Sequence, residues 1–130
     1  MSLGAVDEAT ERSLASGHYV DMTTTGRRTG LARRIEIAIH HFGDRWFISG
    51  QPSRRKRAWI VNLEADPRLT IHVKRPDARA DLPARARIIE DPVERREVLT
   101  RVAAAWRRTD VDRMVEFSPL IEVTFEERTA

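Results

Sequence analysis

The chain has 130 residues, 41% of them hydrophobic, which suits one globular domain with a continuous core. It contains no cysteine, so disulfides, thiolate metal sites and cysteine nucleophiles are excluded. The net charge is only +3, but the basic residues are arginines except for Lys56 and Lys74. Guanidinium groups form bidentate hydrogen bonds with phosphate and carboxylate. No apolar run approaches the roughly 20 residues that cross a bilayer, so we expect a cytoplasmic protein without a membrane partner.

Short runs of alternating apolar and polar residues, separated by turn signals, predict a mostly β domain over residues 17–130. The expected elements, in chain order, are an arm or short helix at 1–16, strands at 17–24, 34–40 and 45–50, a helix from 56 to before 67, strands at 69–74 and 82–90, a helix at 92–108, a short helical turn from 110 and a strand at 121–125.

The second strand has the clearest alternation. Ile35, Ile37 and Ile39 fall on one face, and His40 falls on the opposite face, where we expect it at the surface. Two glycines in the turn at 25–30 can take the positive φ of a tight turn, which makes the first two strands a hairpin. A third strand follows directly, so the three strands predict a meander.

Two helices are predicted from different signals. Trp59 and Leu63 have helical spacing, and Pro67 must end that helix. Asp91 before a proline, with Glu94 three residues later, is a helix start with an N-cap and a capping box. The three tryptophans are expected in the core, and Trp59 is also a candidate for lining a ligand pocket.

The segment between Asp44 and Glu64 contains five basic residues and no acidic one. Four of them are consecutive, at 54–57, in a loop that opens the first helix, where free backbone N–H groups also favour an anion. The hairpin adds Arg27 and Arg28, with Arg33 close behind. In a meander the hairpin and the loop can approach one groove, so the residues predict an anion-binding groove or, alternatively, two separate basic loops.

Several motifs occur in a fixed order. TTTGRRTG at 23–30 precedes the alternating strand, Ile48-Ser49-Gly50 ends the next, and AWIVNLEADP occupies 58–67. Together they resemble the signatures of the deazaflavin-dependent nitroreductase family, and the W-x-x-N-L-x-A-[ND]-P part is the most specific. The resemblance covers residues 23–73, whereas residues 82–127 agree only in the order of elements.

This resemblance implies a mainly β fold, a split β-barrel like that of FMN-binding proteins, with about six strands, a short bridging helix and one longer helix. It implies coenzyme F-420, an 8-hydroxy-5-deazaflavin, as the cofactor, with FMN as the runner-up, and a homodimer. Coenzyme F-420 carries a phosphodiester and several carboxylates, which suit an arginine-rich groove better than the less charged FMN does.

The site residues combine the resemblance with the basic loop. By resemblance, the hairpin arginines hold the phosphate and acidic tail, the end of the third strand runs along the ring, and the helix start lies beside it. The predicted cofactor-binding residues are Arg27, Arg28, Arg33, Ser49, Gly50, Gln51, Ser53, Arg54, Arg55, Lys56, Ala58 and Trp59.

The implied reaction is hydride transfer from the reduced cofactor to a small activated acceptor. No catalytic side chain and no metal are expected, because the cofactor carries the chemistry and the histidines lack metal-ligand spacing. Ile60 follows Trp59 where family members have an aromatic residue, and Tyr19 is the only tyrosine. The acceptor is therefore left open among enones, quinones and nitro compounds.

Three other functions fit parts of the sequence. An FMN-binding split-barrel oxidoreductase would need the same groove, and a non-catalytic storage protein would keep the cofactor site without a substrate pocket. A nucleic-acid-binding small β-barrel would use the arginines to follow a phosphate backbone, although acidic residues nearly cancel the basic ones along the chain.

Overall fold

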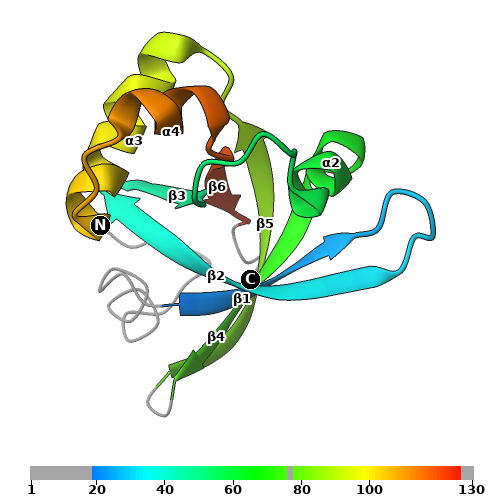
Figure 1. Ribbon diagram of the computed structural model, residues 1–130. Helices are drawn as coiled ribbons and strands as arrows, with labels where there is room; N and C mark the ends of the chain where they lie inside the picture. Colours follow the sequence, from blue (N-terminus) through cyan, green and yellow to red (C-terminus); the bar gives the residue numbers. More distant parts are fainter. Residues whose placement is uncertain (1–18, 76–77, 127–130) are drawn as a thin grey trace.

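The computed structural model describes residues 19–75 and 78–126. The predicted arm at 1–16 and the predicted turn at 76 and 77 lie outside these residues. The elements, shown in Figure 1, are β1 (Tyr19–Thr25), β2 (Ala32–Phe42), β3 (Arg45–Ser49), α2 (Ala58–Ala65), β4 (Arg68–Arg75), β5 (Ala78–Ile88), α3 (Pro92–Trp106), α4 (Val111–Phe117) and β6 (Leu120–Phe125).

The six strands form a closed antiparallel barrel in the order β1-β2-β3-β6-β5-β4. The first three are neighbours, as the predicted meander requires, and β6 closes the barrel by pairing with β3 on one side and β5 on the other. The predicted fold class is confirmed. The described residues form three helices rather than two, because the turn predicted from residue 110 is long enough to be the helix α4.

The barrel interior is filled by alternate residues of the strands, as the period of two predicts. Ile39 of β2, Ile48 of β3 and Ile71 of β4 are completely buried there. Ile35 and Ile37, nearer the hairpin, are only partly buried against the same cluster. Their other sides remain accessible to a ligand on this part of β2.

A second apolar cluster lies outside the barrel, where α3 and α4 pack on it (Figure 1). His40 points to this side and is only 7% exposed, so the expectation of a surface position is wrong. Its ring lies 5.2 Å from the ring of Trp106 on α3, a neighbour that strand alternation alone does not reveal. Burial lowers the pKa of His40 to about 4, which keeps the imidazole neutral near pH 7.

The ends of α3 follow from local chemistry. The side chain of Asp91 accepts a hydrogen bond from the backbone N–H of Glu94 at 2.9 Å, which confirms the predicted N-cap. The helix ends at Trp106, before the predicted end at 108, because Arg107 takes a left-handed conformation with φ of 56°. The other predicted helix, α2, begins at Ala58 rather than at residue 56.

Arg45 belongs to the acid-free basic segment of the sequence, but its side chain forms ion pairs with two glutamates of the fold. It donates to Glu122 at 2.8 Å and to Glu94 at 2.9 Å. Arg87 contacts the same two carboxylates, which completes a four-residue ion-pair network joining β3, β5, β6 and α3. Arg45 is therefore part of the fold and does not contribute to an anion-binding groove.

This network makes stability depend on acid pH. Arg87 and then Arg45 lower the pKa of Glu94 from 4.5 to about 2. A carboxyl with a depressed pKa stabilises the fold above its unfolded-state pKa and loses that contribution as the pH falls through the folded value. We expect the free energy of unfolding to decrease from pH 4.5 towards pH 2, as measured by urea unfolding across this window.

The variant Glu94→Gln should be less stable at pH 7 and should show a weaker pH dependence in the same window. Glu97→Gln is the matched control, since Glu97 is exposed on the same helix and has no ion pair among the described residues. Identical pH profiles for the two variants would contradict the assignment.

Candidate functional site

The β1–β2 hairpin projects beside α2 (Figure 1) and is ordered by its own backbone. Gly26 N–H donates to the carbonyl of Leu31, and Gly30 N–H donates to the carbonyl of Gly26, both at 2.8 Å. Gly30 has a φ of 70°, which glycine adopts without strain. This turn presents the side chains of Arg27 and Arg28 at its tip.

Two hollows lie between the hairpin, β3 and α2. One, of about 430 Å³, includes Arg27, Arg28 and Arg33 of the hairpin with Ala58 and Asn62 of α2. The other, of about 570 Å³, is lined by residues of β1, β2, β3, α2 and the end of α3, among them Ser49, Gly50, Gln51, Arg57 and Trp106. Ile35 and Trp59 line both hollows, so the two hollows adjoin at these side chains, and we call the pair the Trp59 groove.

The end of β3 forms a close-packed part of the Trp59 groove. The hydroxyl of Ser49 donates to the carbonyl of Pro119 at 2.6 Å. A Cβ on Gly50 would lie 3.1 Å from Cγ of Pro119, which is tight enough to require a shift. Glycine at this position therefore lets the backbone after β3 pack closely against the chain before β6.

The charge of the Trp59 groove is strongly positive. Its cationic lining residues within the described part of the chain are Arg27, Arg28, Arg33, Arg57 and Arg108, and Glu36 is the acidic one. The first turn of α2 has no acidic residue, and no side chain at its N-cap position caps the free backbone N–H groups. The helix terminus therefore adds partial positive charge to the arginines.

The sequence did not single out Arg57, although it lies in the basic run. Its Nη2 donates to the carbonyl of Gln51 at 2.8 Å, which turns the guanidinium back along the loop. It lines the Trp59 groove as well as the cavity on the other side of the loop. The signal available in the sequence was its position directly before Ala58, where it becomes the N-cap of α2.

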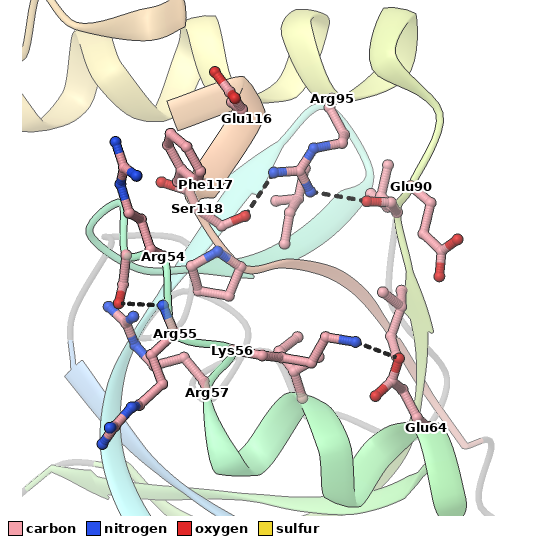
Figure 2. A pocket seen from close by; sticks show the side chains of 16 residues that line it. Arg54, Arg55, Lys56, Arg57, Glu64, Glu90, Arg95, Glu116, Phe117 and Ser118 are labelled. Atoms are coloured by element: carbon pink, nitrogen blue, oxygen red, sulfur yellow. Dashed lines mark hydrogen bonds and ion pairs between the residues drawn. The ribbon is translucent and has the colours of Figure 1, made fainter. Parts of the chain in front are cut away.

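The rest of the basic loop faces a different space. Ser53, Arg54, Arg55 and Lys56 line a cavity of about 450 Å³ between α2, β5, β6 and α4, which we call the loop cavity (Figure 2). Lys56 is paired there with Glu64 at 3.0 Å. The structure thus divides the predicted set of site residues, because Arg57 is shared by the two spaces and these four line only the second.

The loop cavity also contains Arg95, whose side chain is held by backbone oxygens. The guanidinium donates to the carbonyls of Ile89, Met114, Val115 and Ser118, at distances from 2.6 to 3.3 Å. Figure 2 shows the bond to Ser118. Burial lowers the pKa of Arg95. The residue fixes α3 to the end of α4 and thereby supports Pro119 behind Gly50.

Within residues 19–75 and 78–126, no helix is both long and apolar enough to cross a membrane. The same residues contain no cluster of three or more histidine, aspartate or glutamate side chains arranged to hold a metal ion.

A family model described as F420H(2)-dependent quinone reductase matches residues 6–122. The chain belongs to this family. It is therefore a reductase that depends on coenzyme F-420, and the cofactor predicted from the motifs is confirmed over the FMN alternative. The family description names quinones rather than nitro compounds.

Solved structures agree with this membership at the level of the fold. An F420 reductase has a TM-score of 0.67 and 19% identity, with 93% of this chain and 96% of that chain covered. A conserved hypothetical protein from Mycobacterium tuberculosis has a TM-score of 0.74 and 18% identity, over 98% and 86% of the chains. A domain-swapped dimer has a TM-score of 0.60 and 20% identity, over 89% and 94%. No curated protein sequence matches the chain.

The residues of this quinone reductase family member fit its cofactor. The Trp59 groove has a cationic end at the hairpin, and its other hollow is lined by Ile37, Trp59 and Trp106 together with polar side chains. Coenzyme F-420 has the same division between a charged tail and a planar ring. Guanidinium groups suit its phosphodiester and carboxylates, because they form charge-assisted hydrogen bonds with both.

Proposed function

We propose that this protein reduces a small planar acceptor, a quinone or an enone, with coenzyme F-420 bound in the Trp59 groove. The cofactor, when bound, supplies the hydride, so the protein has to bind the cofactor and the acceptor, orient them and exclude water. The observation that supports the proposal is the distribution of side chains along the groove, with three arginines at the hairpin and, towards Trp106, aromatic and aliphatic side chains interspersed with polar ones.

The proposed roles follow from this distribution of side chains. Arg27, Arg28 and Arg33 bind the phosphate and the carboxylates of the tail. Arg57 and the N-terminus of α2 add positive charge between the two hollows. The backbone from Ser49 to Gln51 lies along the ring, where main-chain groups can donate and accept hydrogen bonds. Trp59 forms the wall that separates the ring from the barrel core.

The acceptor is assigned to the far end of the groove. Tyr19, Ile37, Ala38 and Trp106 line it and present mainly apolar or aromatic surface. Arg108 lies at the same end but is paired with Asp110 at 2.6 Å, so its charge is largely neutralised. A flat, uncharged acceptor matches these side chains better than an anionic one does.

Binding and turnover test the proposal separately. Fluorescence titration with coenzyme F-420, FMN and a random DNA single strand should show the tightest binding for coenzyme F-420. Reduced coenzyme F-420 should then be oxidised when menadione is added, as followed by absorbance. A dissociation constant above about 100 μM for coenzyme F-420 would reject the groove, and binding without turnover would reject the acceptor assignment.

Replacing Trp106 should affect the acceptor more than the cofactor. We expect Trp106→Ala to raise the KM for menadione about tenfold, because removing a partly buried aromatic side chain costs about 1–2 kcal/mol. The Kd for coenzyme F-420 should change less than about threefold. Trp106→Phe keeps an aromatic ring and should remain near wild type. Equal effects of Trp106→Ala on both constants would mean that the residue acts on the fold.

We also propose that the protein is a homodimer. The support is a similar fold in a structure described as a domain-swapped dimer. Sedimentation equilibrium tests this directly, and a single species at the mass of one chain, 14.9 kDa, would reject it.

A further inference from the structure

Asn62 of α2 connects the helix to the hairpin. Its side chain is 5% exposed, and its Nδ2 donates to Oγ1 of Thr24 at 3.2 Å. Its Oδ1 accepts the backbone N–H of Arg27, also at 3.2 Å. Among the described residues, these two bonds are the hydrogen bonds that join α2 to the hairpin turn. Both partners lie in the part of the groove that holds the hairpin arginines.

The hairpin does not need Asn62 to keep its own shape. The two backbone bonds at Gly26 and Gly30 close the turn internally. Thr24 is 3% exposed and belongs to the last part of β1. The amide of Asn62 therefore contacts a buried strand residue, Thr24, and a residue of the turn, Arg27, in the same hairpin. The amide thus controls where the turn sits relative to α2.

We propose that Asn62 is a positioning residue that sets the hairpin arginines at the distance from Trp59 that a phosphorylated deazaflavin requires. An amide suits the position because it donates to Thr24 and accepts from Arg27 at once, which a carboxylate or an aliphatic side chain cannot do. This inference rests on the proposed cofactor groove. The inference makes Asn62 responsible for the protein's preference for the phosphorylated cofactor over the phosphate-free chromophore.

The consequence is specific to one half of the ligand. The ring contacts Trp59 and the backbone after β3, and neither depends on the turn. The phosphate contacts the turn, whose offset from α2 the amide determines. Loss of the amide should therefore weaken binding of the phosphorylated cofactor and leave binding of the phosphate-free chromophore nearly unchanged.

The test compares dissociation constants for coenzyme F-420 and for the phosphate-free 8-hydroxy-5-deazaflavin chromophore by fluorescence titration of the full chain. Asn62→Leu should reduce the affinity for coenzyme F-420, relative to the affinity for the chromophore, about tenfold. Thr24→Val removes one of the two bonds and should reduce it about threefold. Thr24→Ser restores the hydroxyl and with it most of the wild-type ratio.

A double-mutant cycle with the combined Arg27→Ala and Arg28→Ala variant identifies the route. In that background Asn62→Leu should cost less than about twofold further, because the turn arginines through which it acts are gone. Equal weakening of both ligands, or full additivity with the combined arginine variant, would overturn the inference and leave the groove intact. A wild-type protein that binds both ligands equally would overturn the groove itself. Should Asn62→Leu fail to fold, the comparison of Thr24→Val with Thr24→Ser tests the inference in its place.

Discussion

Substituting Arg27 and Arg28 together with alanine is expected to weaken binding of coenzyme F-420 about 100-fold. Each guanidinium can form charge-assisted hydrogen bonds to the phosphate or a carboxylate, and two such interactions contribute about 3 kcal/mol in total. Both residues are exposed at the hairpin tip, so the fold should be unaffected. Fluorescence titration gives the affinity, and urea unfolding checks the stability.

The matched comparison is Arg54→Ala with Arg55→Ala, which removes the same charge from the basic loop. These side chains line the loop cavity rather than the Trp59 groove, so we expect a loss of less than about threefold. A loss of more than about tenfold would show instead that the cofactor reaches across the loop. A small effect of the hairpin pair would place the phosphate somewhere else.

Replacing Arg95 with leucine should lower the free energy of unfolding by about 4 kcal/mol, the largest effect on stability that we predict. Its guanidinium satisfies four backbone carbonyls that no other described side chain reaches. Leucine would remove this donor from the carbonyls of Ile89, Val115 and Ser118, whereas the carbonyl of Met114 would keep the backbone N–H of Ser118. The expected change in Tm is about 10 °C or more in a thermal melt followed by circular dichroism.

Arg96→Leu provides the control for Arg95, because the neighbouring Arg96 is exposed and pairs with the highly exposed Asp112. Surface ion pairs of this kind contribute about 0–1 kcal/mol, so its Tm should remain within a few degrees of wild type. If both variants had the same Tm, the hydrogen bonds of Arg95 to the carbonyls would contribute little to the stability of the fold.

The sequence predicted the strands and the start of α3 because strand alternation and the N-cap at Asp91 are local signals, whereas the closed barrel was implied by the resemblance of the motifs. The period of two places Ile39 and Ile71 inside without any knowledge of their partners. The burial of His40 escaped prediction because it results from α3, which begins more than 50 residues further along the chain and covers that face. Alternation assigns a residue to a face but does not say what covers the face.

The candidate site was predicted in part for a similar reason. The motif places Arg28 and Trp59 in the correct order, and the meander brings them to one groove. The division of the basic run at Arg57 depends on how the loop packs against Pro119 and Phe117. The backbone N–H of Ser53 donates to the carbonyl of Phe117 at 3.1 Å, a contact between distant segments that charge counting does not reveal.

The position of β6 has a consequence for synthesis on the ribosome. The strand β3, which ends in the Trp59 groove, has an unpaired edge until β6 emerges about 70 residues later. Unpaired edges of apolar strands invite pairing with other chains. We therefore expect nascent chains that stop before residue 120 to aggregate and to require a chaperone, whereas release of β6 closes the barrel and completes the wall behind Gly50.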